Sequence, residues 1–175
     1  MASATHTLIS TQTLGSAAAT VTLSSIPTSY SDLKLVCSIR GDFNSFPNTV
    51  KVTLNSDTLN YSETYISGTT SNVFSSRGSF SFLGNGSIKM DYLANTASVF
   101  GALEIYIPNY NSTGGKQLFA ISAAEQNDTT AGHWVTAVDA GLYRGTSGIT
   151  SITLAPTSGN FVASSTFYLY GIKNS

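Results

Sequence analysis

The fold is decided by the C-terminal stretch Ile149-Thr-Ser-Ile-Thr-Leu-Ala-Pro-Thr-Ser-Gly-Asn-Phe-Val-Ala-Ser-Ser-Thr-Phe-Tyr-Leu-Tyr-Gly-Ile-Lys-Asn-Ser175. Apolar residues alternate with Ser and Thr on both sides of a Pro, Ser, Gly and Asn turn, which predicts two β-strands. In an extended chain Tyr168 and Tyr170 share one face, and Phe167 and Leu169 share the other. Both faces are therefore apolar, and we expect this stretch to be anchored in a core or an interface.

The same alternation recurs at short intervals along the chain, with Gly, Asn, Asp and Pro turns between the apolar segments. This pattern predicts an all-β protein, an antiparallel β-sandwich for which we favour the jelly-roll type, in one domain spanning 1–175. The side chains expected to face its interior are Leu33, Leu35, Cys37, Ile39, Val50, Val52, Leu103, Ile105, Ile107, Ile152 and Leu154.

One segment departs from this pattern. Residues 67–81 are rich in Ser, Thr and Gly, and their only apolar anchors are Val73, Phe74 and Phe80. We expect a long loop or a weakly paired edge strand there.

The composition limits the function. Only 10% of the 175 residues are charged, against roughly 25% in an average soluble protein. A surface solvated by Ser, Thr and Asn costs less to desolvate, which suits a protein contact and also a sugar binder. The net charge of -1 argues against nucleic acid as a partner, and no apolar run is long enough to cross a membrane.

Residues that could carry chemistry lack the spacing that a catalytic or metal site needs. Cys37 alternates with apolar neighbours, which indicates a buried structural thiol. His133 has carboxylates nearby in sequence but no paired-ligand spacing, so we interpret it as structural or surface. Glu104 and Glu125 lie in or beside predicted strands, where a sandwich-type glycosidase carries its acid and nucleophile, yet nothing else supports that pairing. We expect no enzyme activity, no cofactor and no metal.

Tyrosines provide the candidate interaction surface. Tyrosine rings can stack on pyranose rings while Asn and Asp side chains bind hydroxyls, although strand aromatics also serve as core or interface. The candidate residues are Tyr61, Tyr65, Tyr106, Tyr110 and Tyr143.

Three stretches carry a resemblance to a known group of proteins. They are Ile149–Ser175, Ala19-Thr-Val-Thr-Leu-Ser-Ser-Ile-Pro-Thr-Ser-Tyr-Ser-Asp-Leu33 and Glu104-Ile-Tyr-Ile-Pro-Asn-Tyr-Asn111. Together they resemble small virion structural proteins of tailed bacteriophages, of the capsid decoration, head fibre or tail fibre type. The resemblance implies a non-enzymatic decoration (cement) protein on the outer capsid surface, with the major capsid protein as partner. The alternative is a carbohydrate-binding receptor-recognition module of a tail or head fibre.

We also expect self-association. Strands with neutral Ser and Thr faces and few lysines are poorly defended against edge pairing, which favours a symmetric homo-oligomer. A trimer is the favoured state if the protein sits on a capsid three-fold axis.

Overall fold

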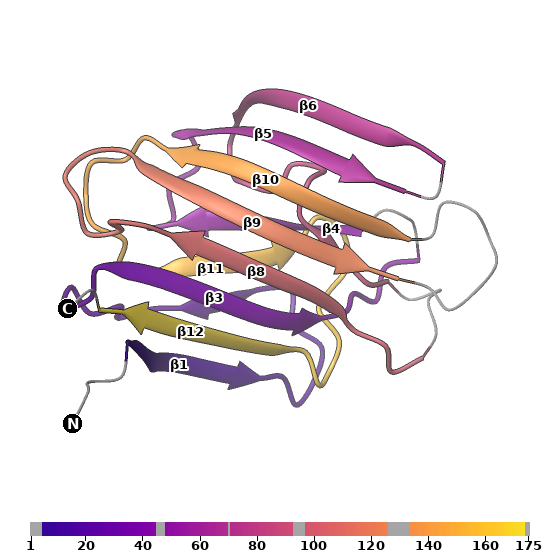
Figure 1. The fold of residues 1–175 in the computed structure, drawn as a ribbon. Helices are drawn as coiled ribbons and strands as arrows, with labels where there is room; N and C mark the ends of the chain where they lie inside the picture. The colour runs from indigo at the N-terminus through magenta and orange to yellow at the C-terminus, as the bar shows by residue number, and fades with distance from the viewer. Residues whose placement is uncertain (1–4, 45–47, 70, 93–96, 126–133, 174–175) are drawn as a thin grey trace.

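A computed structural model describes residues 5–44, 48–69, 71–92, 97–125 and 134–173. In these ranges the chain forms two sheets of antiparallel strands that pack face to face as a sandwich (Figure 1). The predicted all-β antiparallel sandwich is confirmed, whereas its jelly-roll connectivity stays a prediction. The described residues contain no helix long and apolar enough to span a membrane.

The two sheets differ in size. The large sheet has eight strands in the order β1 (His6–Thr13), β12 (Thr166–Ile172), β3 (Asp32–Ile39), β8 (Gly101–Ile107), β9 (Lys116–Ala124), β10 (Val135–Tyr143), β5 (Tyr61–Gly68) and β6 (Val73–Phe80). The small sheet has four strands in the order β2 (Val21–Leu23), β11 (Ile152–Pro156), β4 (Asn48–Leu54) and β7 (Lys89–Met90). The large sheet stands in front of the small one in Figure 1, so its outward face is turned to the viewer.

The two C-terminal strands lie in different sheets. β11 pairs with β2 and β4, whereas β12 pairs with β1 and β3, so the turn between them crosses from one layer to the other. Asp42 fixes this crossing, because its carboxylate accepts hydrogen bonds from the backbone N and the side-chain Nδ2 of Asn160 at 2.7 and 2.8 Å. Gly159 takes a φ of 72° beside it, a conformation that suits glycine.

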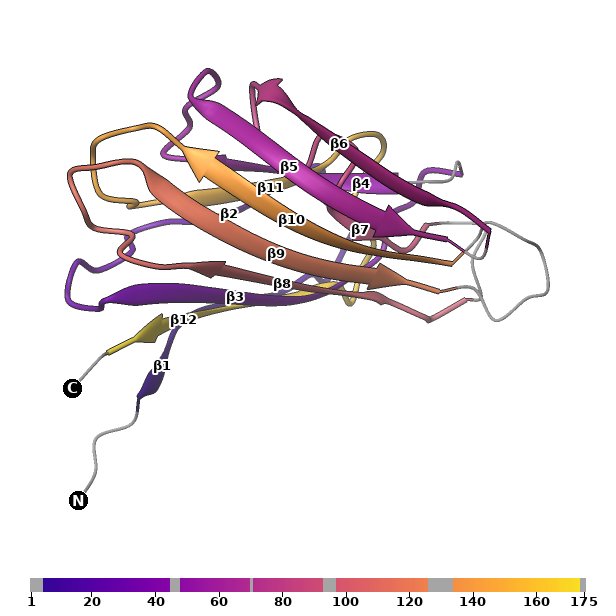
Figure 2. The same ribbon diagram turned by 45° about the horizontal axis from the view of Figure 1, so that its top comes forward.

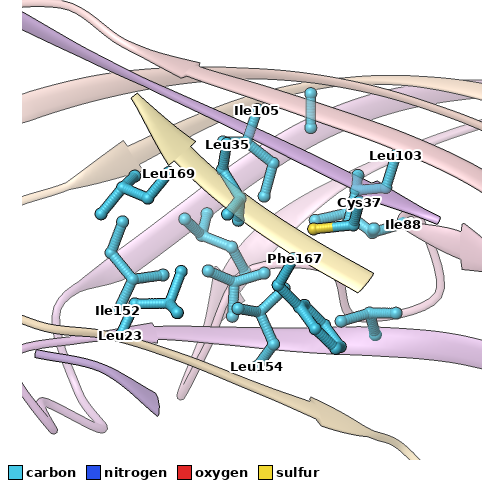
Figure 3. Packing of buried hydrophobic residues seen from close by; sticks show 14 of the residues in the cluster. Leu23, Leu35, Cys37, Ile88, Leu103, Ile105, Ile152, Leu154, Phe167 and Leu169 are labelled. Carbon is cyan, nitrogen blue, oxygen red and sulfur yellow. The ribbon is translucent and has the colours of Figure 1, made fainter. Parts of the chain in front are cut away.

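The hydrophobic core lies between the sheets. Figure 3 shows Leu35, Ile105 and Phe167 of the large sheet facing Ile152 and Leu154 of the small one. All eleven side chains predicted to face the interior are buried, each at most 3% exposed. Burial of one such aliphatic side chain contributes roughly 1.5 to 3 kcal/mol.

Cys37 belongs to this core, as predicted. Burial raises the pKa of its thiol, which keeps the sulfur protonated and unreactive.

The two edge strands of the large sheet stand apart from the core. Figure 2 shows β1 at one margin and β6 at the other. No residue of β6 belongs to the core cluster, and only Ile9 of β1 packs against it. The predicted loop or weakly paired edge is therefore an edge strand, with residues 67 and 68 completing β5 instead.

Candidate interaction surface

Apolar side chains line the outward face of the large sheet. Strand pairing places Tyr168 beside Val36, Ile121 beside Val138, and Val138 beside Ile66 on that face. Phe119 lies two residues from Ile121 and points the same way. We call these residues the apolar band: Tyr168, Val36, Phe119, Ile121, Val138 and Ile66. Glu104 of β8 lies between Val36 and Ile121 and divides the band into two parts.

Half of the apolar band is open to solvent, and its other members, Val36, Val138 and Tyr168, are half-buried. Ile66 is 51% exposed, Phe119 48% and Ile121 43%, although each lies within the middle strands of a sheet. The chain therefore leaves large apolar side chains uncovered side by side on one face, which is typical of a surface that binds a partner.

This face also carries little net charge. Lys34 and Glu104 form an ion pair of 2.9 Å at adjacent strands of the face. Asp32 lies at its margin, where it is buried and accepts hydrogen bonds from the Tyr106 hydroxyl at 2.7 Å and the Asn109 backbone N at 2.9 Å. The charges of the six inner strands are thus either paired or buried, and they present no single-sign field to a partner.

A shallow hollow of about 510 Å³ lies over β9, β10, β5 and β6. Its polar rim includes Gln117, Ser62, Ser79 and Arg77. Phe119 stands next to it, directly across from Ala140, which lines the hollow. The Arg77 guanidinium has no acidic partner among the described residues. The hollow therefore combines hydrogen-bond donors with a neighbouring aromatic ring.

Most of the tyrosines proposed as an interaction surface are not on the surface. Tyr61, Tyr110 and Tyr143 are at most 3% exposed, so their assignment to a surface is wrong. Tyr61 and Tyr143 stack on each other with ring centroids 5.1 Å apart. The Tyr61 hydroxyl accepts from the Leu54 backbone N at 2.8 Å, and burial raises its pKa.

The other three candidate tyrosines, Tyr110, Tyr65 and Tyr106, place their hydroxyls in three different parts of the molecule. Tyr110 donates its hydroxyl hydrogen to the Pro27 carbonyl, which ties a buried ring to the connection between β2 and β3. Tyr65 is half-buried on the inward side of β5, close to Gly86. Tyr106 is the one candidate tyrosine on the outward face, and it is half-buried with its hydroxyl bound to Asp32. No cluster of exposed tyrosines exists among the described residues.

A polar cluster that the sequence did not suggest lies on the inward side of the same strands. Glu63 of β5 accepts a hydrogen bond from the Gly84 backbone N at 2.7 Å, and Asp139 of β10 accepts one from the Ser87 hydroxyl. Ser122 of β9 accepts from the Lys89 backbone N at 2.9 Å. All three acceptors are buried. Together they hold the segment 84–89, which leads from β6 to β7, against the large sheet.

Burial and mutual proximity control the ionisation of this cluster. Burial, followed by the charge of Asp139, raises the pKa of Glu63 to about 7. Burial also raises the pKa of Asp139, against the hydrogen bond from Ser87 that lowers it. Burial therefore favours the neutral form of both carboxyls. The sequence does contain a signal for Glu63. It is two residues from both Tyr61 and Tyr65, so all three side chains point to the same face of β5, the inward one.

The other residues considered for chemistry do not form a site. Glu104 is engaged with Lys34, and Glu125 is exposed beyond the end of β9. His133 lies outside the described residues. Within the described part of the chain, no group of three His, Cys, Asp or Glu side chains is placed to hold a metal ion.

Comparison with protein-family models, with curated proteins and with solved structures finds no match for this chain.

Proposed function

We propose that this protein is a non-enzymatic structural protein of a phage virion, a capsid decoration (cement) protein that binds the major capsid protein through its apolar band. The observation that carries the proposal is the broad, nearly uncharged face with Ile66, Phe119 and Ile121 exposed. The resemblance of three sequence stretches to virion structural proteins supplies the context and the partner.

The chemistry of the face suits a permanent protein contact. Transfer of exposed apolar area out of water stabilises a complex by roughly 25 cal/mol per Å² before the costs of association. The Lys34–Glu104 pair brings no net charge into such a contact. A protein that binds the assembled head and not its dissociated subunits stabilises the head by mass action.

The test uses heads of the phage that encodes this chain, prepared without it. The added protein should bind these heads and raise the temperature at which they disrupt. Because the contact is apolar, binding should weaken little between low and moderate salt, where screening erodes a charge-driven contact.

Matched variants locate the contact. Phe119→Lys and Ile121→Lys should abolish binding while leaving the folded state intact, since both side chains are exposed. Thr22→Lys, an exposed position on the outward side of the small sheet, should bind like the wild type. Loss of binding in Thr22→Lys alone would refute the proposed face, and failure of the wild type to bind heads would refute the function.

Carbohydrate binding is the second candidate, and the hollow beside Phe119 favours it. Arg77 and Gln117 can donate to sugar hydroxyls or to a uronate carboxylate, while Phe119 offers its ring to the apolar side of a pyranose. The volume of about 510 Å³ accommodates one or two sugar rings.

A glycan array separates the two candidates. Saturable binding of a host polysaccharide that Arg77→Ala and Phe119→Ala abolish, together with no binding to heads, would replace the decoration function with receptor recognition. Head binding without glycan binding would support the decoration function.

A further inference from the structure

The edge strands β1 and β6 are unequally protected against pairing with another chain. β1 shows a register shift between Leu8 and Ser10, an irregularity that turns an edge away from partners. β6 pairs with β5 in unbroken register from Val73 to Phe80, and the sheet has no strand on its other side among the described residues. It contains no Pro, Lys, Asp or Glu, the residues that usually blunt an edge, and its one charge is Arg77.

β6 also exposes apolar side chains on both of its faces. Val73 points outward and is 73% exposed, whereas Phe74 points inward and is 52% exposed. The small sheet does not cover Phe74, because no residue of β6 belongs to the core. An eight-residue strand with a free edge and two uncovered apolar side chains is a template for a further strand.

We propose that β6 pairs with β6 of a second copy of this chain, antiparallel about a two-fold axis perpendicular to the sheet. This inference goes beyond the proposed function and does not depend on it. A second copy of the chain is a suitable partner for two reasons. The strand is neutral apart from Arg77, and in one antiparallel register its side chains complement those of an identical strand.

Only registers that join side chains of the same face are possible about such an axis. Outward side chains of β6 have odd numbers and inward ones even numbers, as its pairing with β5 shows. Two such registers pair seven residues. One sets Arg77 directly opposite its own copy, which is unfavourable. The other places Ser76 on the axis and sets Arg77 opposite Ser75 of the second copy.

The register with Ser76 on the axis also covers the exposed aromatic ring. It sets Phe74 opposite Gly78 of the second copy. In each chain the Phe80 ring lies over Gly78, with Phe80 Cζ only 2.5 Å from where a β-carbon on that glycine would stand. Phe74 of one copy therefore meets the Phe80 ring of the other across a glycine, an arrangement that aromatic residues and glycines favour in neighbouring strands.

The two-fold axis turns both outward faces in the same direction. The dimer then displays two apolar bands on one continuous sheet, and a repetitive target can engage both at once with a gain in avidity. The expected homo-oligomer would be a dimer instead of the trimer favoured from the sequence.

Sedimentation and cross-linking of the full chain test this arrangement. The wild type should sediment at twice the 18.4 kDa chain mass. Oxidised Ser76→Cys should form a reducible covalent dimer, because the two β-carbons come within about 5 Å. Ser79→Cys should not, since its two copies stand about 20 Å apart in this register. The native Cys37 is buried and gives no background.

Further variants separate pairing from misfolding. Phe74→Lys should sediment as a monomer with the circular dichroism of the wild type, because Phe74 contributes nothing to the core. A wild type that stays monomeric up to about 1 mM would overturn the proposal. So would a trimer mass, or cross-linking of Ser79→Cys or of a Ser10→Cys variant on β1 as readily as Ser76→Cys.

Discussion

The inward and outward faces of β5, β9 and β10 both depart from the usual distribution of polar and apolar residues. Their outward face exposes Ile66, Phe119 and Ile121, whereas their inward face buries Glu63 and Asp139. Elsewhere in the large sheet, as on β3 and β12, the inward side chains are apolar and the outward ones mixed. Whether a side chain on these strands is buried therefore depends on what packs against its face of the sheet, and not on its hydrophobicity alone.

Each of these departures has its own physical reason. A buried carboxyl is tolerable where it is hydrogen-bonded, and Glu63 and Asp139 are bound by Gly84 and Ser87 of the crossing segment. An exposed apolar residue costs the folded chain little and becomes favourable when a partner covers it. The inward polar cluster thus serves folding, and the outward apolar band serves binding under the proposed function.

The largest effect should come from breaking the inward side. Asp139→Ala leaves the Ser87 hydroxyl buried without its acceptor and should lower the free energy of unfolding by about 2 to 3 kcal/mol. Ile121→Ser on the outward face of the neighbouring strand should change it by less than about 0.5 kcal/mol. Urea denaturation of the two variants measures both values, and equal losses would contradict the division of roles between the faces.

The inward cluster should also make stability depend on pH. The pKa of Glu63 rises from 4.5 to about 7 on folding, so between these values the folded chain holds a proton that the unfolded chain has lost. The free energy of unfolding should therefore fall as pH rises through this window, by on the order of 2 kcal/mol. Asp91, whose pKa burial raises to about 6, adds a slope of the same sign.

Urea denaturation at a series of pH values measures this slope. Glu63→Gln should remove the share of Glu63 and leave those of Asp91 and of Asp139, whose pKa burial also raises. Asp42 has the opposite sign, because hydrogen bonds from Asn160 lower its pKa, but its effect is confined to pH values near and below its ordinary 3.8. A stability that rises from about pH 5 to pH 8 would contradict the assignment.

Glycine-to-alanine substitutions should distinguish the two faces by a smaller effect on the free energy of unfolding. A β-carbon on Gly141, which points inward, would stand 2.5 Å from Leu83 Cδ2, so Gly141→Ala should cost about 1 to 2 kcal/mol as Leu83 shifts. A β-carbon on Gly68, which lies on the outward side, would meet nothing within 4 Å, and Gly68→Ala should be neutral within about 0.5 kcal/mol. Thermal unfolding of both variants measures the two costs, and the reverse order would show that the outward side is the tighter one.

The smallest effect concerns self-association. In the proposed dimer the two Arg77 side chains stand diagonally across the axis and repel each other weakly. Arg77→Ser should therefore tighten the dimer by about twofold to threefold, and added salt should have a similar effect on the wild type. Sedimentation equilibrium at two salt concentrations measures this, and weaker dimerisation of Arg77→Ser would mean that Arg77 makes an attractive contact instead.

Much of the fold could be predicted because period-two alternation is a local property. Leu33, Leu35 and Ile39 alternate within a few residues, and any strand with that pattern buries them together. The same reasoning identified Cys37 as a core residue and predicted a loop or an edge strand within residues 67–81, where the edge strand β6 lies. In each case the residues that indicate the structure lie within a few positions of one another in the sequence.

The candidate surface could not be predicted in this way. Alternation shows that Tyr61 and Tyr143 differ in face from their chain neighbours, but it does not say which face the small sheet covers. Both rings turn out to face inward, where they stack on each other. On β9 the sequence also left the inward face undecided, because Phe119 and Ile121 share one face while Leu118 shares the other with Lys116 and three small residues.

Local alternation and composition were enough to predict the class of fold, the positions of β2, β3, β4, β8, β11 and β12, and the low charge of the surface. The crossing of the segment 84–89 beneath β5, β9 and β10, in contrast, depends on tertiary contacts. That crossing supplies backbone and hydroxyl partners for Glu63 and Asp139, which makes their burial tolerable and turns Ile66 and Ile121 to the outside. The partners are distant in sequence, so no local pattern could reveal them.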